Sequence, residues 1–195
     1  DSHSYSVSDN RFEVVGGQLK LKDGGSLDHD TEPSVAVTVT STDGSGASVS
    51  ESFNIGVTNV NEGPTDIGLS NATVAENSAG AVIGTLSTTD VDAGGSHSYS
   101  VSDNRFEVAG GQLKLKAGVS LDYETEPHVA VTVTSTDGGG ASVSESFSIG
   151  VTNVNEGPTD IGLSNATVAD NSPGAVIGTL STVDVDAGDS HGYSV

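Results

Sequence analysis

Carboxylate and amide side chains recur along this chain in short clusters. The clusters are AEN at Ala75–Asn77, DVD at Asp90–Asp92 and Asp184–Asp186, LDHD at Leu27–Asp30, LDYE at Leu121–Glu124, and the segment TNVNEGPTDIG, which occurs unchanged at Thr58–Gly68 and Thr152–Gly162. Ca²⁺ takes about six to eight oxygen ligands from groups of this kind. The chain has no cysteine, so a thiolate site is impossible, and the histidines do not cluster with the acids, which disfavours zinc and copper. The residue types therefore point to calcium.

The charge balance is strongly acidic. The chain has 27 acidic and 6 basic residues and a formal net charge of −21. Such a field repels nucleic acid and anionic membranes, and the sequence has no apolar run long enough to span a bilayer. We therefore expect no nucleic-acid partner and no direct membrane insertion. The acids are either a solvated, salt-tolerant surface or a set of cation sites, and their positions must decide between these readings.

The sequence is a tandem repeat. SHSYSVSDNRFEV begins at Ser2 and again at Ser96, a period of 96 − 2 = 94 residues. Taking the prolines of the two NEGP segments as starts predicts three parts: residues 1–63, the later part of a preceding repeat; residues 64–157, a complete repeat; and residues 158–195, the opening strands of the next. A window cut from a longer array is expected, and the last part could complete the first part of a neighbouring chain by strand donation, giving head-to-tail chains.

The elements that must position the acids are β-strands. Valine, threonine and serine dominate and aromatic residues are few, which favours strands over helices. In VAVTVTST, Val129, Val131 and Val133 are expected to face the core. About seven strands are predicted in the complete repeat, near 66–69 with 73–74, 82–87, 97–101, 105–108, 112–116, 129–136 and 141–151. The fold class predicted is all-β, a tandem array of Greek-key, immunoglobulin-like β-sandwiches.

Five motifs in order resemble those of cadherin repeats. Cadherins carry x-E-N, D-x-D, L-D-R-E, D-x-G and D-x-N-D-N-x-P, and this chain carries AEN, DVD, LDYE, TDG and NVNEGP. Each motif alone is weak, but five in one 94-residue frame, reproduced in the next frame, are specific. The resemblance covers essentially the whole chain and is strongest to bacterial cadherin-like repeats of large surface adhesins. It implies cadherin-like sandwiches with Ca²⁺ at the junctions between successive repeats.

The resemblance also implies the metal ligands at two junctions. The first junction would use Asp28, Asp30, Asn59, Asn61, Glu62, Asp90, Asp92 and Asp137. The second would use Glu76, Asp122, Glu124, Asn153, Asn155, Glu156, Asp184 and Asp186. A counterpart of Glu76 for the first junction would lie before residue 1, so that site is expected to be incomplete.

Departures from the family motifs leave the number of ions open. Asn59 and Asn153 stand where the family usually has Asp, Glu62 and Glu156 replace a linker Asp, and one residue before the proline is absent. These changes suggest two ions per junction rather than three. Where the two repeats differ at a candidate ligand position, the side chain nevertheless remains a carboxylate, as with Asp30 in one repeat and Glu124 in the next. The alternative interpretation is that the acids are ordinary turn residues, as we prefer for Asp103 and Asn104.

The function implied is a calcium-rigidified structural or adhesive module of a large bacterial extracellular adhesin or matrix protein. Weak extracellular calcium sites would fill outside the cell, so a secreted or surface location is expected. The alternative is a calcium-dependent polysaccharide-binding module, although aromatic stacking platforms are few. His3, His97 and His191 recur with the repeat, and since an enzyme seldom needs its site every 94 residues, no enzymatic activity is predicted.

Overall fold

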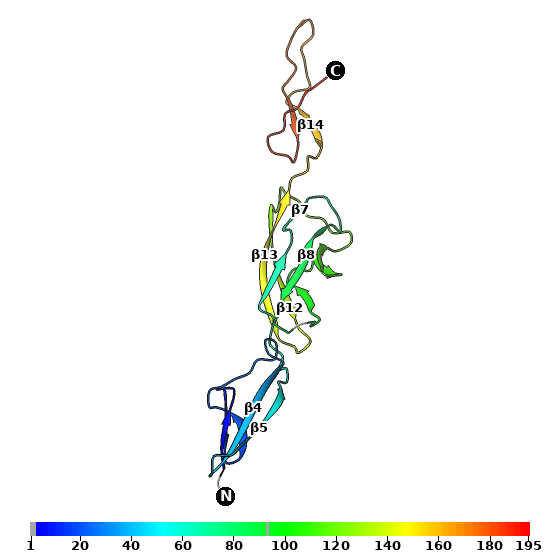
Figure 1. The fold of residues 1–195 in the computed structure, drawn as a ribbon. Helices are drawn as coiled ribbons and strands as arrows, with labels where there is room; N and C mark the ends of the chain where they lie inside the picture. The colour runs from blue at the N-terminus through cyan, green and yellow to red at the C-terminus, as the bar shows by residue number, and fades with distance from the viewer. Residues whose placement is uncertain (1–2, 93) are drawn as a thin grey trace. The chain divides into compact units, whose positions relative to one another are not determined.

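The structure is a computed structural model and describes residues 3–92 and 94–195 (Figure 1). These residues form fifteen β-strands, in keeping with the all-β prediction, and contain no helix long and apolar enough to cross a membrane. The chain divides into two compact units, which are described separately. Unit 1 comprises Asp1–Thr65, Asp90–His97 and Asp137–Ala141, and unit 2 comprises Asp66–Thr89, Ser98–Thr136 and Ser142–Val195.

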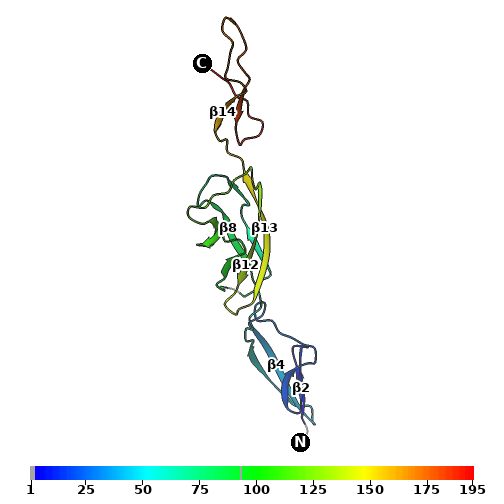
Figure 2. The ribbon, with the colours of Figure 1, turned by 180° about the vertical axis from the view of Figure 1, so that it is seen from behind.

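Unit 2 contains a β-sandwich of two four-stranded sheets, seen from two sides in Figures 1 and 2. One sheet has the order β10 (Phe106–Ala109), β11 (Gln112–Leu115), β8 (Val82–Thr89) and β6 (Asp66–Leu69). The other has the order β7 (Thr73–Ala75), β13 (Ser142–Thr152), β12 (His128–Thr136) and β9 (Ser98–Val101). All pairs are antiparallel except β7 with β13. The prediction of an all-β sandwich is confirmed.

Alternation along β12 builds the core of this sandwich. Val129, Val131 and Val133 are buried as predicted, while the hydroxyls of Thr132 and Thr134 bond across to serines on the outer face of β13. Burying each valine contributes about 1.5–3 kcal/mol. The opposite sheet supplies the other half of the core with Ile67, Ile83, Leu86, Phe106, Leu113 and Leu115.

One detail of the strand prediction differs. The prediction groups residues 66–69 and 73–74 as one strand element, but β6 and β7 belong to different sheets. The Asn71 side-chain amide donates to the carbonyls of Thr73 (2.9 Å) and Ile83 (2.7 Å) and fixes the crossing between them. This crossing places residue 76, directly after β7, beside the end of β13, because Glu76 N donates to Thr152 O at 3.1 Å.

Unit 2 also contains a hairpin from the next repeat. Strand β14 (Asp160–Leu163) pairs with β15 (Leu180–Val183) in the register that β6 and β8 adopt one repeat earlier. The acids Asp184 and Asp186 follow β15 directly.

Unit 1 is built from fewer strands. The sheet β1 (His3–Val7), β4 (Ser34–Asp43) and β5 (Ser48–Gly56) faces the hairpin of β2 (Phe12–Val15) and β3 (Gln18–Leu21). Its buried hydrophobic residues are Phe12, Val35 and Val37, with partly buried side chains around them. Unit 1 therefore has a much smaller core than the sandwich of unit 2.

Candidate metal centre

Glu76 is the buried carboxylate of the acidic site in unit 2. Its side chain is 1% exposed. Oε1 accepts a hydrogen bond from Val154 N at 2.7 Å, and Oε2 accepts one from Tyr123 N at 2.8 Å. Glu76 thus joins the loop before β12 to the segment after β13. Asn77 follows with a φ of 57°, a left-handed conformation that Asn tolerates better than most residues.

Carboxylates from four segments of the chain converge at Glu124. Glu76, Asp122 and Glu124 have oxygen atoms within 4.8 Å of one another, and so have Glu124, Glu156 and Asp186. Desolvation, with the charges of Glu76, Glu156 and Asp186, raises the pKa of Glu124. The neighbouring charges and burial therefore disfavour the ionised form of the Glu124 carboxylate, whereas a bound cation would favour that form.

The linker 153–156 is held against the residues that follow β15. Asn153 Nδ2 donates to Glu124 Oε1 at 3.0 Å and to Asp186 Oδ1 at 2.8 Å. Glu156 N donates to Asp186 Oδ2 at 2.6 Å, and Asp186 is 7% exposed. Asn155 Nδ2 donates back to the Glu156 carbonyl at 2.7 Å, so Asn155 shapes the linker.

The donor set fits a calcium ion. Glu156 Oε2 is buried and has no hydrogen-bond partner, whereas Glu156 Oε1 accepts from Asn77 Nδ2. A buried carboxylate oxygen without a partner carries a large desolvation cost. Glu124 and Asp186 have carboxylate oxygens within 4.8 Å of a Glu156 carboxylate oxygen, and these are ligands of the hard type that Ca²⁺ prefers. Asn77 was not predicted as a site residue, although it is the last residue of the AEN motif.

Unit 1 holds a smaller group of the same kind. Asp30, Glu62 and Asp92 have oxygens within 4.8 Å of one another. Asn59 Nδ2 donates to Asp92 Oδ1 at 2.7 Å and Glu62 N to Asp92 Oδ2 at 2.8 Å. Desolvation, with the charges of Asp92, Asp30 and Asp28, raises the pKa of Glu62.

Several predicted ligands lie outside these groups and have structural partners. Asp28 Oδ1 accepts from Asp30 N at 2.9 Å and stabilises the turn there. Asp137 accepts from Ala141 N at 2.9 Å and from Asn61 Nδ2 at 3.0 Å. These bonds, the Asn61 contact first, lower the pKa of Asp137. Asp137 and Asn61 therefore stabilise the β12–β13 hairpin loop.

Asp90 and Asp184 are each paired with a histidine. His97 Nε2 lies 2.9 Å from Asp90 Oδ2, and His191 Nε2 lies 2.8 Å from Asp184 Oδ2. The hydrogen bond from the histidine is the main reason that the pKa values of both aspartates lie below their usual range. The expectation that histidines stay apart from the acids is therefore wrong for these two pairs, and both aspartates orient the loops that carry Asp92 and Asp186.

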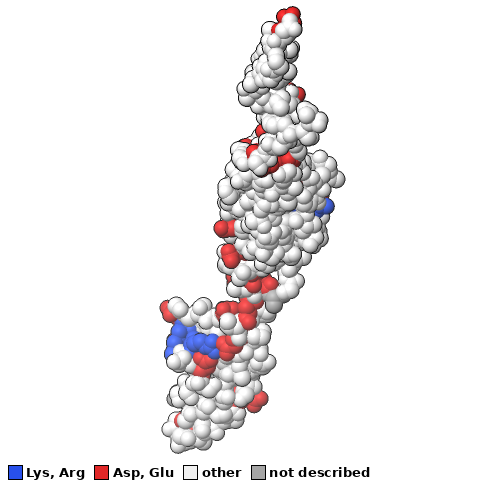
Figure 3. All heavy atoms as spheres, turned by 90° about the horizontal axis from the view of Figure 1, so that it is seen from above, with Lys and Arg blue, Asp and Glu red and all other residues white. Residues whose placement is uncertain are grey.

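Arginine and tyrosine side chains have packing and bonding roles that sequence reasoning missed. Arg105 bonds to Asp103, in the expected turn, and also reaches Glu126 at 2.6 Å. Its counterpart Arg11 joins Asp9 and Glu32 in unit 1. The Tyr99 hydroxyl lies 2.8 Å from Thr88 Oγ1, whereas Tyr5, Tyr123 and Tyr193 are 50%, 38% and 45% exposed. Acidic side chains gather into patches on the face shown in Figure 3, while large areas carry no charge.

The comparisons with known proteins show the fold. No protein-family model matches the sequence, and neither does any curated protein sequence. The structure is similar to protocadherin gamma B2 extracellular cadherin domains 3–6 (TM-score 0.70, 23% identity, 95% of this chain and 49% of that chain). It is also similar to human CDH23 EC21–23 (TM-score 0.73, 16% identity, 95% and 69%).

These likenesses define the chain as an all-β protein with a cadherin-like β-sandwich fold. The chain spans about half the length of protocadherin structures such as gamma B2 domains 3–6 and PcdhgB3 EC1–4, 49% and 50% respectively. At this level of identity the likeness defines the fold alone.

Proton competition gives one prediction for the acidic site of unit 2. The pKa of Glu124 is raised above its ordinary value of 4.5. As the pH falls through this raised pKa, protonation relieves the repulsion among the carboxylates and removes an anionic oxygen that a calcium ion would need. Calcium affinity should therefore begin to fall at a higher pH than it would if this glutamate had an ordinary pKa. At pH values below the pKa of Glu124, the affinity should fall by about tenfold per pH unit. Calcium titrations at a series of pH values check this, and Glu124→Gln should flatten the dependence.

Proposed function

We propose that the chain is a calcium-stiffened structural and adhesive repeat module of a large bacterial extracellular adhesin or matrix protein. Ca²⁺ would be held by Glu76, Asp122, Glu124, Glu156 and Asp186 in unit 2. In unit 1 the corresponding ligands would be Asp30, Glu62 and Asp92. The bound ion supplies positive charge that neutralises the converging carboxylates, and no chemical transformation is involved.

The chain's own residues set the geometry of this proposed site. Glu76 holds two backbone N–H groups and keeps the loop 121–124 against the linker. Asn153 and Asp186 hold the linker against the loop after β15. His97 and His191 orient the aspartates that begin the two DVD loops. These contacts hold the carboxylates close together.

The observation that carries the proposal is the unpartnered buried oxygen of Glu156. A purely structural turn would satisfy that atom with an N–H group, as Asp28 and Asp137 are satisfied. A secreted or surface location follows from the same proposal, because sites of this type in extracellular modules bind with dissociation constants of about 10⁻⁴–10⁻³ M.

Calorimetry of calcium binding tests the proposal. The unmodified chain should bind Ca²⁺ in that range, and Glu156→Gln should weaken binding at the unit 2 site by about tenfold or more, because it removes a charged ligand. Glu145→Gln is the matched control, since Glu145 lies exposed on β13 and should bind as the unmodified chain does. Absence of any calcium heat at millimolar concentration, or equal affinity of the two variants, would refute the metal site.

A further inference from the structure

The turn between β12 and β13 holds the side chain of a linker residue. Residues 137–141 of this turn belong to unit 1, together with the linker at residues 58–63. Asn61 Nδ2 donates to Asp137 Oδ2 at 3.0 Å and to the Glu62 carbonyl at 2.8 Å. Asp137 is only 9% exposed, so the linker amide bonds to a carboxylate that is largely shielded from water. A hydrogen bond to a charged group is stronger than one between neutral groups.

Glycine at residue 139 gives the linker side chain access to the turn. A Cβ atom on Gly139 would lie 2.5–2.6 Å from three side-chain atoms of Asn61, far inside van der Waals contact. The backbone of Gly139 is not in the left-handed region, so the space that Asn61 fills, rather than the conformation of the turn, requires glycine here. A second close approach lies beside it, because a Cβ atom on Gly63 would stand 3.1 Å from the Ala141 Cβ.

The corresponding turn of the first copy satisfies its aspartate from within. Residues 43–47 form a turn with the same pattern of backbone hydrogen bonds as residues 137–141. Ser45 stands where the second copy has Gly139, and Ser45 Oγ donates to Asp43 Oδ1 at 2.7 Å. A hydroxyl inside the turn there takes the role that the linker amide has in the second copy.

We propose that the turn 137–141 is a docking site for the Asn61 side chain and holds the linker in place without metal. The residue at position 139 determines whether the site is open, because glycine leaves room for the amide group and a serine side chain fills that room. The inference goes beyond the proposed function, since none of the carboxylates proposed to bind calcium in unit 1 takes part in the docking.

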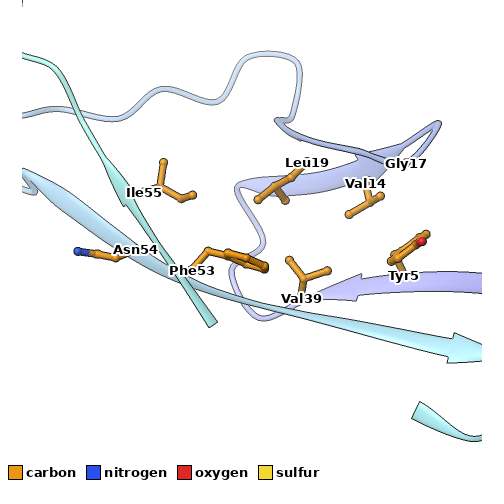
Figure 4. A pocket seen from close by; sticks show the side chains of 8 residues that line it. All are labelled: Tyr5, Val14, Gly17, Leu19, Val39, Phe53, Asn54 and Ile55. Carbon is orange, nitrogen blue, oxygen red and sulfur yellow. The ribbon is translucent and has the colours of Figure 1, made fainter. Parts of the chain in front are cut away.

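The docking site lies apart from the core of unit 1. That core is packed between the β2–β3 hairpin and the sheet of β1, β4 and β5, where Leu19 and Ile55 line the apolar pocket shown in Figure 4. Among the described residues, neither the turn nor the linker contributes to the lining of that pocket. Substitutions at residues 61 and 139 should therefore leave the packing of unit 1 unchanged, which thermal unfolding followed by circular dichroism checks.

Cleavage by a glutamate-specific protease after Glu62 measures how often the linker leaves this site. The protease cuts a locally opened state, so the rate follows the population of that state when opening and closing are fast. In chelator, Gly139→Ser should raise the rate by about tenfold or more, because serine displaces the Asn61 amide and supplies its own donor. The turn should stay intact, since residues 43–47 already accept serine at this position. Cleavage after Glu156 in the same chain is the internal reference and should not change.

Two further variants separate docking from a general effect of substitution in the turn. Gly138→Ser should leave the rate unchanged, because no atom lies within 4 Å of a Cβ at that position. Asn61→Ala should raise the rate as Gly139→Ser does, and the two changes together should raise it no further, since both remove the same contact. Equal rates for the two serine variants, or additive effects of Asn61→Ala and Gly139→Ser, would overturn the proposal.

Repeating the cleavage in calcium separates docking from the proposed metal site. The expected result is a faster cleavage of Gly139→Ser already in chelator, and this expectation stands even if no calcium binds to the chain. A rate equal to that of the unmodified chain in chelator, with an increase that occurs only in calcium, would mean that Asn61 and Asp137 hold an ion between them. That outcome would overturn docking without metal.

Discussion

Replacing Glu76 by alanine should lower the stability of the sandwich of unit 2 more than any other single change at the acidic site. The carboxylate is 1% exposed and accepts hydrogen bonds from two backbone N–H groups, of Tyr123 and Val154. Alanine leaves both donors unsatisfied inside the protein, and hydrogen bonds to a charged group contribute about 1.5–3 kcal/mol each. We expect a loss of about 3 kcal/mol in the free energy of unfolding, or about 12–20 °C in Tm for a domain of this size.

The repeat supplies the control for this substitution. Asp170 occupies the same position one repeat later, but it is exposed, and among the described residues its carboxylate accepts a hydrogen bond only from its neighbour Asn171. Asp170→Ala should therefore leave Tm unchanged within error. Thermal unfolding followed by circular dichroism, in chelator so that metal binding does not contribute, measures both variants. Equal stability of Glu76→Ala and Asp170→Ala would mean that the buried carboxylate does not hold the two segments together.

This pair of residues also shows what the sequence could predict about the site and what it could not. The resemblance of the motifs to those of cadherin repeats implied that acids from the AEN, LDYE, NVNEGP and DVD segments belong to one site. Burial was not predictable from the motif, since AEN and ADN differ by one methylene group. Glu76 is buried because strand β13 and the loop 121–124 are both present around it.

Which acids join a carboxylate group and which pair with other residues could not be predicted from the sequence for a similar reason. Asp90 and Asp92 stand two residues apart in one motif, yet only Asp92 joins a group of carboxylates. Asp90 instead meets His97, seven residues further along a loop whose path no periodicity indicates. By contrast, the core positions of β12 were predictable, because strict alternation of valine and threonine determines which side chains face inward.

The second large effect concerns the mobility of the 158–195 segment. Carboxylate oxygens from the loop before β12, the linker and the loop after β15 lie within 4.8 Å of one another. Two like charges about 4 Å apart repel by about 1 kcal/mol in water and about 4 kcal/mol at a protein surface. A bound calcium ion should turn this net repulsion into net attraction, because one divalent ion attracts the carboxylates of all three segments at once.

Single-molecule energy transfer should therefore report a narrow distance distribution in millimolar calcium and a broad one in chelator. Dyes on Ser148→Cys and Ala175→Cys, both exposed positions, place one label on β13 and one on the segment 158–195. A pair on Ser148→Cys and Thr85→Cys, both within the sandwich of unit 2, should give the same narrow distribution in both buffers. In the Glu156→Gln background the calcium effect should shrink, since that change removes the carboxylate with the unpartnered buried oxygen. If the first pair gave identical distributions with calcium and with chelator, the carboxylates would be solvated surface charge, and stiffening by metal could not be the function of these repeats.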